Sequence, residues 1–299
     1  MNSYSKFLVS MFMLTTFVLY SSDQSNKTMR PLSLGESIFV GGTVGAAEVV
    51  LPGQILTYAM NRAIAKNHKV TQNLKQQRPT LREAYRGFTA NALGQIPITA
   101  VQKVIQVKGS ELAEDLRGTK LSDSQKTAIS FTAGVGGAVI DTPSNAIQLY
   151  LQDKVNAGKK IQVRTALQVL GLKSMRGFVP NAFLKEGPFA VGYQVLAPKC
   201  TDLVKLHVDD DLAAKAIGGA VAGVVTAVIT QPGAVLRNKM QAEWNNMLGK
   251  TAWEVAKTTY TKEGIGGLWR GLPQRGTRVA LAVPLYVAYT NLLEQKIKE

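Results

Sequence analysis

The sequence has few of the residues that build disulfides, metal sites or catalytic triads. It contains 1 cysteine, Cys200, and 2 histidines, His68 and His207, among 299 residues. A single cysteine excludes an intramolecular disulfide and any zinc site made of several cysteines. Two histidines far apart in the chain argue against a histidine-centred metal site or triad. We therefore expect no metal, no cofactor and no catalytic residue.

A strict glycine-rich phosphate loop is also missing, which argues against a nucleotide-hydrolysing enzyme. Acidic residues are scarce, with 20 Asp and Glu against 35 Lys and Arg, giving a formal net charge of +15. Such a balance is typical of proteins that bind nucleic acid or anionic membranes, so a soluble basic binding protein is one reading. Apolar segments of roughly 20 residues, long enough to cross a bilayer, alternate with the basic stretches. This distribution favours a membrane protein without a nucleic-acid partner.

One element occurs three times. An apolar segment ends close to a proline, which removes a helical hydrogen bond and kinks a helix. The three prolines, Pro52, Pro143 and Pro232, are 91 and 89 residues apart. The residues nine positions after them are Asn61, Gln152 and Gln241. A spacing near one third of the chain predicts an internal repeat.

The remainder of each repeat is also alike. A basic stretch follows the proline segment, and a second apolar segment follows Arg86-Gly87-Phe88, Arg176-Gly177-Phe178 or Arg270-Gly271-Leu272. We expect an all-α membrane protein with six transmembrane helices, in three two-helix repeats of about 100 residues. The predicted boundaries are 34–120, 121–208 and 209–299. Residues 1–33 form an apolar extension, for which a short extra membrane anchor is an alternative.

These repeats resemble the mitochondrial carrier family. The third repeat matches best, with Pro232, Arg237-Asn238-Lys239-Met240-Gln241 and Gly267-Leu268-Trp269-Arg270-Gly271-Leu272-Pro273. The resemblance implies pseudo-threefold symmetry, short matrix-side helices and a monomeric, multi-pass protein of the mitochondrial inner membrane. It implies transport of a small solute by alternating access.

The family closes the matrix side of its cavity with ion pairs from the pattern Pro-x-Asp/Glu-x-x-Lys/Arg. Here the acidic positions hold Gln54, Asn145 and Ala234, and the basic positions hold Thr57, Gln148 and Arg237. Only one of six charges remains. We assign these residues, the three prolines, Lys239 and Glu294 to gates, and we expect Asp141 to pair with a basic residue near them. Amide hydrogen bonds are weaker than buried ion pairs, so we expect loosely coupled gates that allow net uniport besides exchange.

Carriers of this family bind their substrate halfway along the second helix of each repeat. By that resemblance, the predicted binding residues are Asn91, Gln95, Asn181, Lys185, Glu186, Arg275 and Arg278. The cations suit an anionic ligand. Asn91 stands where nucleotide carriers of the family have an asparagine, which implies ATP or ADP. The pair Lys185-Glu186 resembles amino-acid carriers instead, so an amino acid or another small anion is the alternative.

Loss of the gate charges from all three repeats, together with the apolar extension, is unusual for a eukaryotic carrier. It resembles a nucleotide carrier that a bacterium secretes into the mitochondria of its host. A non-transporting effector that binds host membrane proteins is a further alternative. The basic stretches at 66–82 and 159–173 are either solvated loop faces or surfaces that attract anionic lipid, cardiolipin in this membrane.

Overall fold

The computed structural model describes residues 32–48, 57, 88–152, 162–242, 250–280, 282, 293 and 297, and all the regular structure in them is helical. This agrees with the all-α prediction. The elements are α2 (Leu34–Glu48), α6 (Phe88–Arg117), α7 (Asp123–Gln152), α8 (Val163–Leu170), η3 (Gly171–Met175), η4 (Pro180–Glu186), α9 (Gly187–Val191), η5 (Gly192–Leu196), α10 (Ala197–Lys205), α11 (Asp211–Ala242), α12 (Ala252–Glu263) and η6 (Ile265–Trp269). Residues 272–280 are helical as well.

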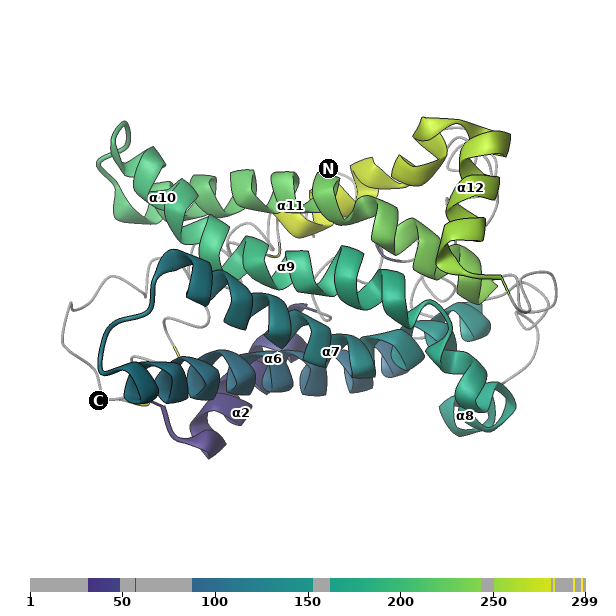
Figure 1. The fold of residues 1–299 in the computed structure, drawn as a ribbon, viewed down its shortest axis with the longest axis horizontal. Coiled ribbons are helices and arrows are strands. Elements are labelled where there is room, and N and C mark those ends of the chain that lie inside the picture. Colours follow the sequence, from purple (N-terminus) through teal and green to yellow (C-terminus); the bar gives the residue numbers. More distant parts are fainter. Residues whose placement is uncertain are drawn as a thin grey trace, which may run out of the picture.

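Long helical rods lie side by side along the longest axis of the molecule (Figure 1). The elements η4, α9, η5 and α10 follow one another without a break and form one rod. This rod packs against both α7 and α11, while α6 packs against α2 and α7. The short helices α8 and α12 lie at the same end of the rods, on the right in Figure 1, with α12 above and α8 below.

The predicted prolines of the second and third repeats lie within helices. Pro143 is inside α7 and Pro232 is inside α11. The first proline, Pro52, lies outside the described residues, as do Gln54, Glu294 and residues 1–31 of the predicted extension.

The repeated Arg-Gly-Phe/Leu motif has a conformational reason. Gly177 and Gly271 adopt φ angles of 76° and 81°, a left-handed backbone that favours glycine. The carbonyl oxygen of each then accepts a helical hydrogen bond from the residue four positions on, Asn181 at 3.0 Å and Arg275 at 3.1 Å. Each glycine therefore turns the chain from the preceding 3₁₀ segment into the second helix of its repeat.

Helix α11 is apolar on the outside and polar on the inside. Its outward residues are 40% to 60% exposed and recur at helical spacing: Ile217, Val221, Val224, Val225, Val228 and Ile229. Thr226, Thr230 and Gln231 on the other face are buried. A water-soluble helix shows the reverse polarity, whereas this pattern is typical of a helix between lipid and a polar interior.

By length and composition, one helix among the described residues can cross a membrane, at Ala213–Ala242. Its 30 residues span about 45 Å at 1.5 Å per residue, more than the ~30 Å hydrocarbon core of a bilayer. Helices α6 and α7 are as long as that span but carry more polar residues. Thr142, Asn145 and Gln148 of α7 are buried against other helices, so a polar interior accounts for part of this difference.

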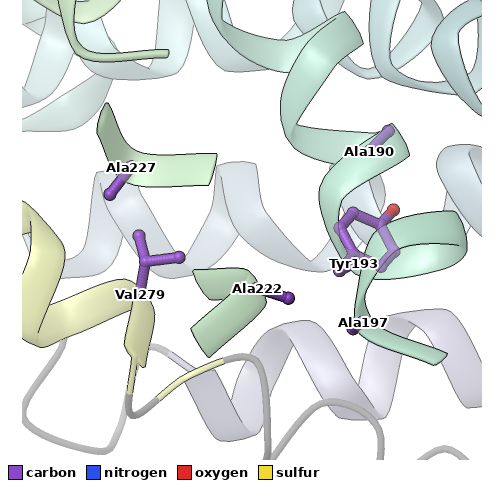
Figure 2. Close-up of a cluster of buried hydrophobic side chains, with 6 residues drawn as sticks. All are labelled: Ala190, Tyr193, Ala197, Ala222, Ala227 and Val279. Atoms are coloured by element: carbon purple, nitrogen blue, oxygen red, sulfur yellow. The ribbon is translucent and has the colours of Figure 1, made fainter. Parts of the chain in front are cut away.

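The rod and α11 meet through small side chains (Figure 2). A buried cluster joins Ala190, Tyr193 and Ala197 of the rod to Ala222 and Ala227 of α11, with Val279 from the last described helix. Small residues let helices approach closely, and this is how helices associate where lipid removes the hydrophobic driving force.

Candidate functional site

A cavity lies between α6, α7, the η4–α9–η5 rod, α11 and the last described helix. Its charged lining comes from Asp141, Lys185, Glu186, Arg237, Arg275 and Arg278. Its uncharged polar lining includes Thr57, Gln95, Gln102, Asn145 and Gln148. Within the described lining, four cations face two carboxylates, and the cavity therefore has an excess of positive charge.

Two glycines bring the charged rod segment close to its neighbours. A Cβ atom on Gly134 would lie 2.1 Å from the carbonyl oxygen of Glu186, and one on Gly233 would lie 2.6 Å from the carbonyl carbon of Leu184. Helices α7 and α11 can therefore both touch the backbone of η4. This close packing fixes Lys185 and Glu186 at the wall of the cavity.

Asp141 lies at the centre of the charged groups. The Lys185 ammonium donates to Asp141 Oδ2 at 2.7 Å, and Arg237 Nη1 donates to the same oxygen. Lys185 also pairs with Glu186. The Lys185 and Asp141 side chains are 13% and 15% exposed. One carboxylate thus connects η4 with α11.

Beside this group, Arg237 lies in a layer of amides. Arg237 Nη2 donates to Asn145 Oδ1 at 3.0 Å, and Nη1 donates to Asn181 Oδ1 at 3.0 Å. Asn145 Nδ2 donates to Gln241 Oε1 at 2.6 Å and to Asn238 Oδ1 at 3.1 Å. We call Asn145, Asn181, Arg237, Asn238 and Gln241 the amide layer. It links α7, η4 and α11 across one end of the cavity.

Another part of the cavity wall is held by a chain of hydrogen bonds. Gln102 Nε2 donates to Glu186 Oε2 at 3.2 Å, and the Tyr193 hydroxyl donates to Gln102 Oε1 at 3.0 Å. Gln194 Nε2 in turn donates to the Tyr193 oxygen at 2.9 Å. This chain ties α6 to the rod and orients the Glu186 carboxylate.

The two remaining cations come from the last described helix. Arg275 is 4% exposed, and its Nη1 donates to the Thr230 carbonyl oxygen of α11 at 2.9 Å. Arg278 Nη1 donates to the Thr57 hydroxyl at 2.8 Å, a contact between residues 221 positions apart. Both guanidinium groups also line the cavity.

Residues 209–299 match the model of the family described as mitochondrial carrier protein. The match covers the third predicted repeat. This agrees with the resemblance of its repeats. Transport by this chain and its place in the inner mitochondrial membrane stay predictions at this point.

Three curated relatives differ in what their names say they carry. The chain is similar to kidney mitochondrial carrier protein 1 of Xenopus laevis, with 29% identity over 52% of this chain and 55% of the relative. It is 25% identical to mitochondrial tricarboxylate transporter 1 of Mycosarcoma maydis, over 85% and 92%. It is 21% identical to the probable S-adenosylmethionine carrier 2, chloroplastic, of Arabidopsis thaliana, over 72% and 63%.

The match to the Xenopus laevis relative spans about half of that protein's length. None of these three names mentions an adenine nucleotide, and none of the three is a bacterial protein. The chain is thus similar to several carriers, while its substrate and its delivery into a host cell stay predictions.

The structure brings most of the predicted binding residues together. Gln95, Lys185, Glu186, Arg275 and Arg278 all line the cavity. Asn181 is buried in the amide layer, where it also donates to the Thr142 hydroxyl at 2.8 Å. Asn91 belongs to α6, but its side chain is not among those described.

The predicted gate residues separate into two places. Thr57, Asn145, Gln148 and Arg237 line the cavity, and Ala234 is buried in α11 near them. Lys239 lies elsewhere, because it pairs with Glu263 at the end of α12. Glu263 also accepts from Arg270 Nη1 at 2.9 Å. Lys239 therefore fastens the end of α11 to α12 in this structure.

The expected ion pair of Asp141 with a basic residue is present, with Arg237 as the partner and Lys185 as a second one. The central position of Asp141 in the cavity was not part of the sequence prediction. Nor were Gln102 and Tyr193. The signal for Asp141 was its isolation, since it is the sole charged residue between Thr127 and Gln148. No sequence signal distinguishes Gln102 from other helical glutamines.

Proposed function

We propose that this carrier moves an anionic solute across the inner mitochondrial membrane by alternating access, with ATP and ADP as its substrates. The observation that carries this proposal is the cavity lining of four cations and two carboxylates. An ionised group taken out of water costs several kcal/mol unless a partner compensates it. An anionic solute in the cavity compensates the excess positive charge, and each transport step ends when the solute leaves the cavity.

The geometry of the cations suits a ligand with several anionic oxygens. Arg275 and Arg278 are three residues apart on one helix, so their guanidinium groups reach the cavity from the same side. Lys185 approaches from η4 on a different helix. Arginine can bind a phosphate through two parallel hydrogen bonds, while lysine acts as a compact point charge. A chain of phosphates between these groups would meet all three cations.

Alternating access requires a cavity that can close at each end. The amide layer links three helices across one end, and we propose that it is the matrix-side gate of the three predicted repeats. Of its five members, Arg237 alone is charged. Neutral hydrogen bonds stabilise by about 0.5–1.5 kcal/mol each, less than an intact buried ion-pair network, so we propose that the gate opens without a counter-substrate and permits net uniport.

An amino acid is the second candidate substrate. Lys185 and Glu186 form an adjacent pair whose side chains are 13% and 8% exposed. Such a pair can bind the carboxylate and the ammonium group of one amino acid. The phosphates of a nucleotide cannot use the Glu186 carboxylate in this way, because two negative charges at short range repel each other.

Uptake by liposomes that contain the purified protein tests the proposal. Labelled ATP is offered to empty vesicles and to vesicles preloaded with ADP, with unlabelled ADP, arginine and citrate as competitors. We expect ATP uptake that ADP blocks, including uptake into empty vesicles. Block by arginine would favour the amino-acid candidate, and block by citrate another small anion. An absence of ATP uptake would direct attention to Lys185-Glu186 and an amino-acid substrate, and protein that neither binds nor moves any small anion would support a non-transporting role.

A pair of matched variants adds a residue-level control. Arg164 is exposed on α8, away from the cavity lining. We expect Arg278→Gln to reduce ATP uptake strongly and Arg164→Gln to leave it at the wild-type rate. Equal rates for both variants would contradict the assignment of the cavity as the substrate site.

A further inference from the structure

The carboxylate that neutralises Arg237 is one helical turn away from the position that the repeat pattern assigns to it. The pattern places an acidic residue at 145, where this chain has Asn145, and Asp141 lies four residues earlier on the same face of α7. Both side chains contact Arg237, through Nη2 and Nη1 respectively. The carboxylate that pairs with Arg237 is therefore displaced by one turn, to a position where it also reaches Lys185.

This displacement gives the gate carboxylate a second partner. The oxygen that accepts from Arg237 also accepts from Lys185 Nζ at 2.7 Å. Lys185 of η4 and Arg237 of α11 both line the cavity, and Arg237, which is 2% exposed, also belongs to the amide layer. Asp141 Oδ2 thus joins Lys185, a predicted binding residue, to Arg237, a residue of the proposed gate.

We propose that Asp141 is a built-in competitor of the substrate, holding Lys185 in the empty carrier as an anionic group of the solute holds it in the loaded one. This inference rests on the proposed function and adds a coupling device to it. A solute anion that takes Lys185 away from Asp141 breaks one of the two contacts that fix the carboxylate. The same event brings a second negative charge beside Asp141.

The two effects act on the gate in the same direction. Like charges about 4 Å apart repel, more strongly in a partly dry cavity than in water. Asp141 then turns from Lys185, and its bond with Arg237 weakens as the side chain moves. Coupling of this kind is reciprocal, so whatever loosens the Asp141 contacts must also raise the affinity of Lys185 for the solute.

Three variants test the inference, all made by exchanging acid and amide. Asp141→Asn removes the competing charge. The double variant D141N/N145D returns a carboxylate to the position beside Arg237 Nη2, one turn away from Lys185, at unchanged net charge. Asp123→Asn is the control on the same helix, since Asp123 pairs with Lys199 at 2.5 Å on the surface, with side chains 67% and 53% exposed.

Two readouts apply to each protein, both with ATP as the probe. The first is the ATP concentration that gives half of the maximal rise in thermal stability in detergent, which reports binding without transport. The second is the rate of ATP uptake into empty vesicles divided by the rate into ADP-loaded vesicles. The first readout concerns competition for Lys185, and the second concerns the gate.

For Asp141→Asn we expect half-saturation at about a tenfold lower ATP concentration, the factor that one charge-assisted hydrogen bond supplies. We also expect a higher ratio of empty-vesicle to loaded-vesicle uptake. For D141N/N145D the tight binding should persist while the uptake ratio falls back to the wild-type value or below. Asp123→Asn should match the wild type in both readouts.

Half-saturation within twofold of the wild type for Asp141→Asn overturns the inference, and so does weaker binding. The double variant controls for misfolding of the single one, because it keeps a carboxylate for Arg237. A half-saturating ATP concentration in the double variant that is no lower than in the wild type overturns the inference as well. Failure of the proposed function gives a different result. In that case the wild-type protein binds ATP but does not transport it, and the comparison of half-saturating ATP concentrations between the variants still tests the role of Asp141.

Discussion

Gln241 is the residue whose removal should damage the amide layer most. It is fully buried and uses both ends of its side chain. Its Oε1 accepts from Asn145 Nδ2 at 2.6 Å, while Nε2 donates to the Thr142 carbonyl at 2.9 Å and the Arg176 carbonyl at 3.0 Å. These contacts join α11 to α7. They also join α11 to the turn at Arg176, which precedes the second helix of the predicted second repeat. We predict that Gln241→Ala strongly destabilises the folded protein.

The magnitude follows from these contacts. Three hydrogen bonds at about 1 kcal/mol each amount to roughly 3 kcal/mol. Partners left buried without a bond add about 1–3 kcal/mol each, although water that enters from the cavity can satisfy some of them. We therefore expect a loss of about 3–5 kcal/mol. At roughly 2 °C per kcal/mol for a chain of this size, the melting temperature should fall by about 6–10 °C.

Thermal unfolding in detergent, followed by the fluorescence of a dye that reacts with Cys200, measures this loss. Gln168→Ala is the matched control, because Gln168 is exposed on α8 and the same atoms are removed. We expect that control to stay within about 1 °C of the wild type. A decrease of less than 2 °C for Gln241→Ala would refute the reasoning, since it would mean that the layer contributes nothing net to stability.

Three further predictions concern other parts of the structure. Arg275→Gln should reduce ATP uptake by about tenfold or more while protein yield is maintained, measured in the liposome assay, because it removes a buried cation of the cavity. Lys239→Gln should accelerate amide hydrogen exchange in α12, because the contact with Glu263 fastens that helix to α11. Hydrogen bonds from Thr251, chiefly from its backbone N–H, lower the pKa of Glu254 below its usual value of 4.5. The protection of α12 that this cap gives, measured relative to the intrinsic exchange rate at each pH, should persist above pH 4.5 and disappear as the pH falls through the lowered pKa, whereas the protection in Glu254→Gln should not change with pH in that range.

Local rules predicted much of the fold. Proline and glycine constrain the backbone through their own covalent structure, so Pro143, Pro232, Gly177 and Gly271 could be placed from the sequence. Their recurrence at a fixed interval turned weak local signals into a repeat. The wide turns of η4 and η5 could not be foreseen. They depend on contacts with α7 and α11, which residue preferences do not encode.

The cavity was predicted in part for a similar reason. Residues such as Arg275 and Lys185 could be found because charge in an apolar segment requires a partner or a function. The partner itself depends on how helices rotate and slide against each other. Lys239 shows the limit, since it has the same charge and lies two residues from Arg237 but pairs with Glu263 on α12. Two residues on a helix turn a side chain by about 200°, and this separates the interior from the far side.

The position of Asp141 explains how this chain can lack an acidic residue at position 145. Replacing a carboxylate at 145 by an amide would leave Arg237 as a buried cation without a counter-ion, which is costly. Asp141 compensates that cation from one turn away, so stability alone does not require an acidic residue at 145. What changes is the set of groups that the carboxylate can reach. At 141 it bonds with Lys185, a predicted binding residue, and we propose that the closed state of the gate depends on whether Lys185 is occupied. A transporter built in this way would have fewer charges to separate when it opens, and those that remain would respond directly to an anion in the cavity.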